Sequence, residues 1–525
     1  MKQPESPDPS HFHAHCCPCV SHASDDSSAV SRRGFLGGVS LAMLGATALQ
    51  GMTWQALAAL KPDDKPLARR RPLVVKPIFF YSTSSHRPMT SWRPWGGVET
   101  QAQADEEMVR IGGEIKKLAA RADFPVKFLP LTPIKGGPLA SVADLASADV
   151  VIAYASSGNA AQLEELADSG KDVIIFVRHK SGPLYFYYEA VSPFTLRRRK
   201  NDRVVAKSFA EDDVVVDSQD EILWRLRALC GLRNTIGTRI VALGGALGWG
   251  IGPKAAELAK ERFKLEIETV TYDQLKILLQ QAMADTAAVT LAKQQAADYL
   301  KLPGTKLETG RDFLERSFLL TQVFKRMMKQ ANCTAFTIGG CMGAPMPIAH
   351  TTACMPLSLM NDEGYLAFCE SDFVVIPAGM LLANISGRPS FLNDPTYPKH
   401  DGVITLAHCT APRKMDGKHI EPARILTHFE SDYGAAPKVE MRKGQVITNL
   451  IPGFEATRWA GLLGEIVDAP FLPICRSQID IRFKAEPLQV AKRMGGFHWI
   501  TGYGDSTREV AYALRRLNIE FDKIG

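Results

Sequence analysis

The first part of the chain alternates apolar runs with amphipathic segments. Leu73 to Tyr81 is a nearly continuous apolar run, which is typical of a strand buried in a parallel sheet. A helical pattern follows from about Ala102 to Ala122. Further strands are predicted at 125–129, 149–155 and 172–177, with a helix at 159–168 between the last two. This alternation predicts a doubly wound α/β domain over residues 72–235.

A second α/β domain is predicted over residues 236–386. A strand at 238–243 leads into the glycine-rich turn Gly244–Gly252 and a helix at 254–263. The glycines would let either a phosphate group or the backbone of a neighbouring domain approach closely. Their spacing differs from G-x-G-x-x-G, which argues against a dinucleotide site.

The last part of the chain has a different pattern. Short alternating runs are separated by Gly, Pro and Asp, at 424–429, 438–441, 445–450 and 478–483. Such runs predict an antiparallel sheet or a small barrel. The predicted fold class is therefore α/β, with two doubly wound α/β domains followed by a β-rich, barrel-like C-terminal domain over residues 387–525.

Three strand-like runs within residues 364–409 end in side chains that can bind a metal. The first run ends at Glu370 and Asp372, the second at Asp394 and the third at His408. Neighbouring strands of an α/β sheet share one carboxyl edge, so we expect these side chains to face one cleft. Oxygen ligands with an imidazole suit manganese, magnesium, iron or zinc better than copper. Alternatively, the carboxylates only cap the helix that follows.

The front of the chain predicts export. Ser31 to Leu36 reads S-R-R-G-F-L, which fits the twin-arginine signal, and a short, glycine-interrupted apolar stretch follows it. Ala56-Leu57-Ala58 supplies a small-x-small cleavage site. Residues 1–58 are therefore predicted to be a twin-arginine signal peptide recognised by the Tat translocase. The mature protein is expected to begin near Ala59, to keep no stable membrane span and to be periplasmic or secreted.

Composition narrows the possible partners. The chain has 525 residues, of which 46% are hydrophobic, so a sizeable core is expected. The net charge of +6 is small for this length, and no basic stripe is interleaved with aromatics, so nucleic acid is not an expected partner. Three of the 10 cysteines lie in the leader. The remaining seven form no C-x-x-C pair and are expected to be buried thiols, although Cys369 and Cys409 could line the cleft.

Trp92 and Arg93 lie in the sequence S-W-R-P-W-G-G, on the loop expected after the first strand. Binding residues collect on such loops, and aromatic faces with an arginine suit sugars or carboxylates. The alternative is that the tryptophans pack the loop onto the core. On the first interpretation, Trp92 and Arg93 are candidate substrate residues.

C-E-S-D at 369–372, F-L-N-D-P-T-Y at 391–397 and G-G-F-H-W at 495–499 are three motifs that together resemble the L-fucose isomerase and L-arabinose isomerase superfamily, over most of the chain. C-E-S-D at 369–372 resembles the family's E-x-D, whose Glu binds a divalent metal. F-L-N-D-P-T-Y at 391–397 resembles a fucose isomerase segment whose Asp, here Asp394, is the second ligand. G-G-F-H-W at 495–499 resembles the C-terminal glycine-glycine-x-His, which makes His498 the third ligand.

The fucose isomerase branch is the closer match. Arabinose isomerases place a Glu where Asn393 stands and a further His at the position of His408. This chain keeps the His and lacks the Glu. Asn393 and His408, like Asp372, are therefore candidate contacts to the substrate rather than members of the expected ligand set.

The resemblance implies an aldose–ketose isomerase that acts on a small sugar through a cis-enediol. It implies a divalent metal, expected to be Mn²⁺, because such an ion neutralises the oxyanion that forms when a proton leaves the carbon next to a carbonyl. Glu370 and Asp394 would share ligation and proton transfer, with Asp372 orienting or assisting. The resemblance also implies a homo-oligomer, either a trimer or a hexamer.

Two hypotheses follow from the sequence. The first is an exported metal-dependent sugar isomerase or a closely related carbohydrate-active enzyme, whose substrate need not be fucose or arabinose. The alternative is a non-catalytic periplasmic carbohydrate-binding protein with an isomerase-like fold. The enzyme requires Glu370, Asp394 and His498 to converge on one point, whereas the binding protein needs only the cleft.

Overall fold

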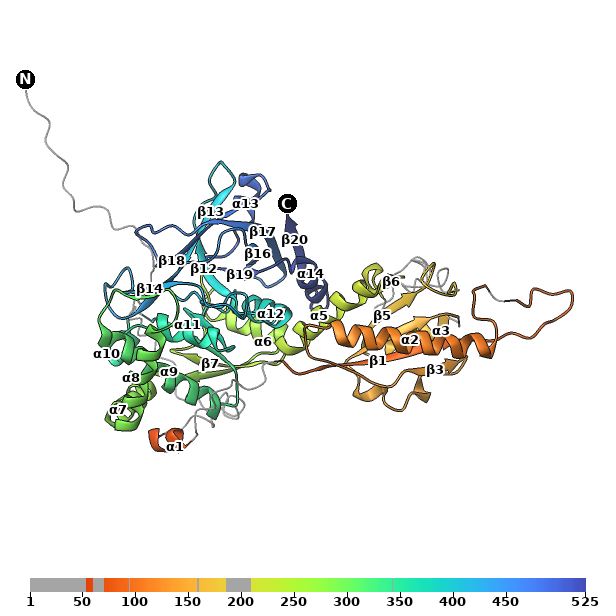
Figure 1. Cartoon of the computed structure of the whole chain (residues 1–525), viewed down its shortest axis with the longest axis horizontal. Helices are drawn as coiled ribbons and strands as arrows, with labels where there is room; N and C mark the ends of the chain where they lie inside the picture. The colour runs from red at the N-terminus through yellow and green to blue at the C-terminus, as the bar shows by residue number, and fades with distance from the viewer. Residues whose placement is uncertain (1–52, 60–69, 94, 158–159, 186–208, 342) are drawn as a thin grey trace, which may run out of the picture.

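The computed structural model describes residues 53–59, 70–93, 95–157, 160–185, 209–341 and 343–525. A parallel sheet forms one end of the molecule, and a second parallel sheet joined to a β-barrel forms the other (Figure 1). The predicted leader lies outside the described residues, except for 53–58. Residues 54–58 belong to helix α1 (Trp54–Ala59), whose Trp54 and Leu57 are buried against helices of the second region.

The N-terminal sheet has six strands, all parallel, in the order β2-β1-β4-β5-β6 with β3 also paired to β1. Its strands are β1 (Leu73–Tyr81), β2 (Val126–Phe128), β3 (Thr132–Lys135), β4 (Val150–Ala155), β5 (Asp172–Val177) and β6 (Val214–Val216). Its helices are α2 (Gln101–Arg121), α3 (Ala160–Asp168) and α5 (Gln219–Thr235). All residues of β1 except Val74 are buried, as its apolar run predicted.

The second sheet has four parallel strands in the order β11-β10-β7-β8. They are β7 (Arg239–Leu243), β8 (Glu266–Val270), β10 (Ala335–Ile338) and β11 (Leu366–Cys369). The helices of this region are α6 (Lys254–Phe263), α7 (Tyr272–Ala284), α8 (Thr286–Leu300), α9 (Arg311–Gln330), α10 (Pro345–Ala349), α11 (Cys354–Asp362) and α12 (Ile376–Ser386). Helix α5 packs closely on α12 at Gly231 of α5 and Ile385 of α12. A Cβ added to Gly231 would lie only 2.3 Å from the side chain of Ile385, so the close contact requires glycine.

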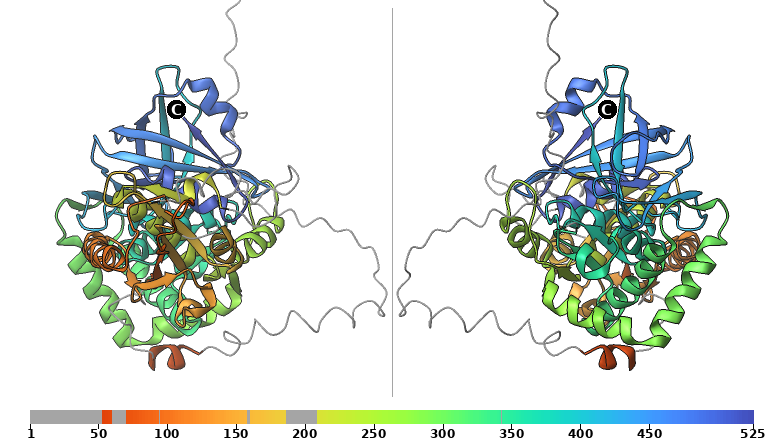
Figure 2. Two further views of the ribbon diagram at one scale, coloured as in Figure 1. Left: turned by 90° about the vertical axis from the view of Figure 1, so that its right-hand side faces the viewer. Right: turned by 90° about the vertical axis from the view of Figure 1, so that its left-hand side faces the viewer.

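Six antiparallel strands close into a barrel in the order β16-β19-β12-β13-β18-β17, since β17 also pairs with β16. They are β12 (Phe391–Pro395), β13 (Val403–His408), β16 (Val446–Pro452), β17 (Arg458–Asp468), β18 (Ser477–Arg482) and β19 (Trp499–Tyr503), with β20 (Glu520–Ile524) added parallel to β17. A separate sheet joins β9 (Thr305–Leu307), β14 (Ala423–Leu426) and β15 (Ala436–Val439). Helices α13 (Pro487–Arg493) and α14 (Thr507–Arg515) complete this part. The barrel strands gather above the helices of the second sheet (Figure 2).

One expectation about the strands is wrong. Glu370, Asp394 and His408 do not follow three neighbouring strands of one sheet, because β11 belongs to the parallel sheet whereas β12 and β13 are antiparallel neighbours in the barrel. All residues of β13 are buried. A fully buried barrel strand therefore has the same continuous apolar pattern as a parallel strand, and the pattern alone cannot separate them.

A search of the described residues for a helix long and apolar enough to cross a bilayer found none.

Candidate metal centre

Four side chains from separate parts of the chain meet where the second parallel sheet adjoins the barrel. Glu370 follows β11, Asp394 lies in β12, His408 ends β13 and His498 immediately precedes β19. Nε2 of His498 lies 3.4 Å from Oε2 of Glu370 and 3.3 Å from Oδ1 of Asp394. Nε2 of His408 lies 3.5 Å from Oε1 of Glu370. The structure thus brings the three predicted ligands together and adds His408 to them.

The atoms that face this point lack the partners that buried polar groups normally have. Oδ1 of Asp394 and Nε2 of both His408 and His498 make no hydrogen bond to any described residue. Leaving a buried polar atom unpaired costs about 1–3 kcal/mol. A divalent cation bound to these atoms would satisfy all of them, and carboxylates with imidazoles are ligands for such ions. The residues present therefore fit a divalent metal.

Both imidazole rings are held at Nδ1. Oδ2 of Asp372 lies 2.7 Å from Nδ1 of His498, and the hydroxyl of Thr410 lies 3.0 Å from Nδ1 of His408. Asp372 is itself fixed, since its other oxygen accepts the backbone N–H of Trp249 at 3.2 Å. Contacts of this kind orient a metal-binding ring and leave Nε2 for the ion. Asp372 therefore lies in an orienting position. It is not placed as the substrate contact that the sequence also predicted, because its side chain is buried and does not line the cavity described below.

The loop after β11 has an unusual backbone. Glu370 and Ser371 have φ angles of 62° and 46°, in the left-handed region that residues other than glycine rarely adopt. Such conformations cost about 1–3 kcal/mol each and collect at functional sites. Oδ1 of Asp372 also accepts the N–H of Val374 at 3.1 Å, just before α12. This carboxylate thus stabilises the turn into the helix and holds a histidine, so both interpretations of Asp372 apply.

The glycine-rich turn after β7 brings Trp249 to the centre. Nε1 of Trp249 donates to Oε2 of Glu370 at 3.0 Å, and its ring stacks on Phe497 with 4.4 Å between the centroids. A Cβ on Gly248 would lie 2.2 Å from the Cβ of Ala255, so a larger residue does not fit there. Close approach to neighbouring elements therefore explains this glycine. Sequence reasoning missed Trp249, although the glycine pattern was its signal.

Burial and neighbouring charges shift the pKa values of the centre in different directions. Burial raises the pKa of Asp394 to about 6, although His408 and His498 act against it. At Glu370 the effect of burial is outweighed by the neighbouring imidazoles of His408 and His498, which hold its pKa well below the usual value. At His498 the effect of burial is outweighed by the hydrogen bond with Asp372 and by the nearby carboxylate of Glu370, which raise its pKa. Protons therefore compensate these carboxylates when no cation is bound, and a metal would displace them.

A cavity of about 550 Å³ opens onto the centre. Its volume falls in the range of small-molecule sites, about 300–1,000 Å³. Glu370, Asp394 and His408 line it, together with Phe497. Five of the seven cysteines, all free, also line it: Cys341, Cys354, Cys369, Cys409 and Cys475. The sequence led us to expect Cys369 and Cys409 there, and it gave no sign of the other three.

Three candidate substrate residues lie elsewhere. Asn393 is completely buried and turned away from the cavity, because successive strand residues face opposite sides, and its side-chain amide donates to Thr501. Trp92 and Arg93 lie on the loop between β1 and α2, at the end of the molecule farthest from the barrel (Figure 1). Trp92 packs on His86 within the same loop. The structure therefore does not bring these three residues to the centre.

Comparison with known proteins assigns neither a family nor a function to this chain. Neither a protein-family model nor a curated protein matches this chain. The geometry of the centre and the motifs that form it are therefore the basis for assigning a function.

Proposed function

We propose that this protein is an exported, metal-dependent aldose–ketose isomerase, or a closely related carbohydrate-active enzyme, of the fucose isomerase type. One observation carries the proposal. Oδ1 of Asp394 and Nε2 of His408 and His498 lack hydrogen-bond partners within the described part of the chain, and they lie around Glu370 at the mouth of a cavity. The residues are those of the three motifs, supplemented by His408.

In this proposal Glu370, Asp394, His408 and His498 hold a divalent cation, with Mn²⁺ as the expected metal. The bound ion supplies Lewis-acid chemistry, because it stabilises the negative charge that develops when a proton leaves the carbon next to a carbonyl. Trp249 and Asp372 hold the ligands in place from outside the centre.

The two carboxylates have different surroundings, which assigns them different roles. The side chain of Glu370 is 12% exposed and accepts a hydrogen bond from Trp249, so it is fixed as a ligand. The side chain of Asp394 is 29% exposed and lines the cavity, so a substrate can reach it. We therefore assign to Asp394 the removal of a proton from one carbon and its return to the next.

The cavity favours a small substrate with few polar groups beyond its reacting end. Apart from the centre, the cysteines and His428, the described residues that line the cavity offer side-chain hydrogen bonds from Thr396 and Glu430. A long oligosaccharide would need many more polar partners in so enclosed a space. The proposed substrate class is thus a short sugar, or a sugar-like hydroxycarbonyl compound with two adjacent oxygens.

Deuterium exchange tests this proposal directly. Untagged mature protein would be incubated in D₂O with a panel of aldoses and ketoses, as purified, after chelation and after reloading with Mn²⁺. We expect deuterium to be incorporated at the carbon next to the carbonyl, and NMR monitors this incorporation. Chelation should abolish the exchange and Mn²⁺ should restore it. Sugar binding without exchange would identify the non-catalytic carbohydrate-binding protein instead. A chain that binds no divalent metal would overturn the proposal.

Export by the Tat translocase and assembly into a trimer or hexamer belong to the same proposal. The first is inferred from the leader sequence and the second from the resemblance. Cell fractionation and light scattering of the purified protein test them separately from the chemistry.

A further inference from the structure

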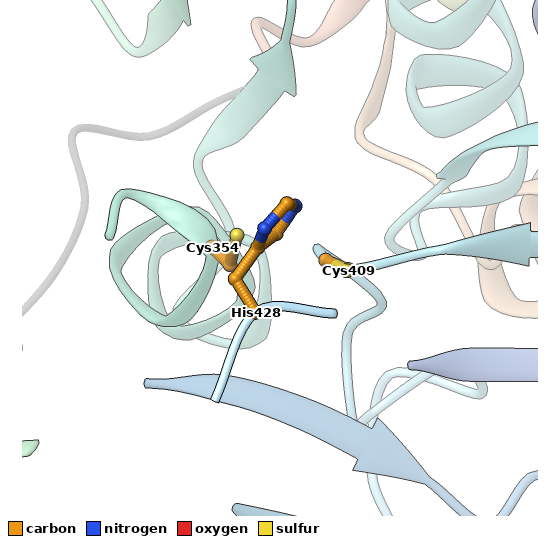
Figure 3. A group of neighbouring side chains, drawn as sticks. All are labelled: Cys354, Cys409 and His428. Atoms are coloured by element: carbon orange, nitrogen blue, oxygen red, sulfur yellow. The ribbon is translucent and has the colours of Figure 1, made fainter. Parts of the chain in front are cut away.

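A second group of metal-binding side chains lines the same cavity. Cys354, Cys409 and His428 point toward one another (Figure 3), and one ligand atom from each lies within 4.8 Å of the others. All three residues are buried, with 4%, 2% and 6% of their surface exposed. None of them belongs to the centre formed by Glu370 and its neighbours.

These three residues come from different elements. Cys354 begins α11, Cys409 follows β13 and His428 follows β14. Such convergence from distant positions is the pattern of a built site rather than of a chance surface cluster. Cys475, from the loop before β18, packs against the same cluster and supplies one more thiol.

Polar contacts around the cluster hold its members in place. The hydroxyl of Ser431 lies 3.2 Å from Nδ1 of His428. The backbone N–H of Arg476 donates to Sγ of Cys409 at 3.4 Å. A hydrogen bond to sulfur favours the thiolate, which is the form that binds metals. Simple packing of buried thiols requires neither an imidazole nor a donor directed at sulfur.

We propose that Cys354, Cys409 and His428, with Cys475 as a fourth ligand, bind a thiophilic d¹⁰ cation, Zn²⁺ or Cu⁺. Thiolates and an imidazole are the preferred ligands of such ions, whereas the oxygen-rich centre suits harder ones. Two sulfurs on a tetrahedral zinc lie about 3.8 Å apart. The ligand atoms of Cys354, Cys409 and His428 lie within 4.8 Å of one another, so a small inward movement brings these three to such an arrangement. The cavity then holds a hard-metal centre and a soft-metal site.

The site does not depend on the proposed isomerase activity, and its test keeps the two apart. Full-length mature protein without a histidine tag would be purified under reducing conditions, loaded with Zn²⁺ or Cu⁺ in parallel, and analysed by mass spectrometry for metal content. We expect one tightly held thiophilic ion per chain. The parallel loadings show which of the two ions the site prefers.

Substitutions locate the ion. Cys354→Ser and His428→Gln avoid the residues next to the oxygen-rich centre, and each should lower the affinity at least tenfold. Cys333→Ser, at a buried cysteine outside the cavity, is the matched control and should retain the ion. Glu370→Gln should also retain it while losing Mn²⁺, so a failure of one site would not be mistaken for a failure of the other.

Cobalt substitution in the unmutated protein makes the test independent of how the variants fold. Thiolate ligands give Co²⁺ a charge-transfer absorption in the near ultraviolet, and we expect this band at one equivalent. The proposal is overturned if the reduced wild-type chain holds no thiophilic ion, or if Cys354→Ser binds as tightly as the wild type. It is also overturned if Cys354 and Cys409 form a disulfide that reduction opens without creating a metal site.

Discussion

Two buried groups of charged side chains, one in each region of the molecule, are built in opposite ways. In the N-terminal region Arg178 lies completely inside the protein, with Nε 2.6 Å from Glu107 and Nη2 2.8 Å from Glu114. Tyr185 donates a further hydrogen bond to Glu107 at 2.6 Å. In this group, which we call the Arg178 cluster, charges of opposite sign satisfy one another.

The centre around Glu370 also places buried carboxylates beside groups that can carry positive charge, but here those groups are histidines and not all of the polar atoms are paired. Its carboxylates and imidazoles leave three polar atoms unpaired within the described residues, and those atoms face a cavity. Burial alone therefore does not mark a functional site. The distinguishing feature is unsatisfied ligand atoms that face one point, because that arrangement costs stability unless something binds there.

The largest expected effect is on the chemistry of the centre. Glu370→Gln keeps the size of the side chain and removes a charged metal ligand, so we expect Mn²⁺ to be lost. The rate of deuterium exchange should then fall by about 10²–10⁴-fold, because the metal supplies several kcal/mol of charge stabilisation. NMR rates and metal analysis measure both. Glu455→Gln, an exposed substitution of the same kind, should change neither. If Glu370→Gln left metal content and turnover intact, the role assigned to that residue would be wrong.

The Arg178 cluster should respond in stability instead of chemistry. Glu107→Gln leaves a buried guanidinium without its closest charge partner, so the free energy of unfolding should fall by about 3–5 kcal/mol. Denaturant titration measures this change, and metal content per folded chain should stay the same. Glu106→Gln, an exposed neighbour on the same helix, is the control. A loss of bound metal in Glu107→Gln without unfolding would contradict the separation of the two groups.

A smaller effect is expected from the residue that orients His498. Asp372→Asn removes the charge 2.7 Å from Nδ1 of His498, and Mn²⁺ affinity should fall about 10–100-fold. Titration calorimetry measures the affinity. The exposed substitution Asp401→Asn should leave it unchanged. Equal affinities in Asp372→Asn and the wild type would show that the histidine needs no such support.

The smallest effect is a difference in the sign of pH dependence. Burial raises the pKa of Asp394 to about 6, so its stabilising contribution is complete at low pH and is lost as pH rises through about 6. At Asp213 burial is outweighed by Arg516 and Arg515, which lower its pKa, so its contribution is present at neutral pH and lost in acid.

In chelator, Asp394→Asn should therefore become more stable than the wild type as pH rises from 4 to 7, by on the order of 1 kcal/mol. Asp213→Asn should become less stable than the wild type as pH rises through the acid range up to about 4, because the lowered pKa of Asp213 lies in that range. Thermal unfolding at several pH values measures both differences. If the stability difference from the wild type changed in the same direction with pH for both variants, the contrast between a satisfied and an unsatisfied carboxylate would be removed.

The sequence predicted the ligands better than their arrangement. Glu370 and Asp394 were found because carboxylates at the ends of apolar runs are conspicuous, and His498 was found through the resemblance. The assignment of their strands to one sheet was wrong, since hydrophobic period does not distinguish a buried barrel strand from a parallel one. The closed barrel itself was predictable from short alternating runs with turn residues between them.

Residues that act only through tertiary contacts could not be found in this way. Trp249 reaches Glu370 because the glycine-rich turn after β7 pairs at Leu247 with Asp372 in the turn after β11, and the glycine pattern does not reveal which residue this turn meets. Cys354, Cys409 and His428 are separated from one another by many residues in the sequence, so no short spacing between ligands marked their cluster. Trp92 and Arg93 resembled a sugar-binding loop by composition, yet composition does not determine which edge of the molecule a loop occupies.

His408 and Cys409 are consecutive residues at the end of β13, and each belongs to a different proposed metal site. A shift of this strand end that improves one set of ligand distances must alter the other. Filling either proposed site would therefore change the affinity of its neighbour without being required for binding there, and the factor must be identical in both directions because binding free energies are functions of state. The peptide bond between these two residues would thus make a two-metal protein sensitive to the ratio of hard and soft ions around it.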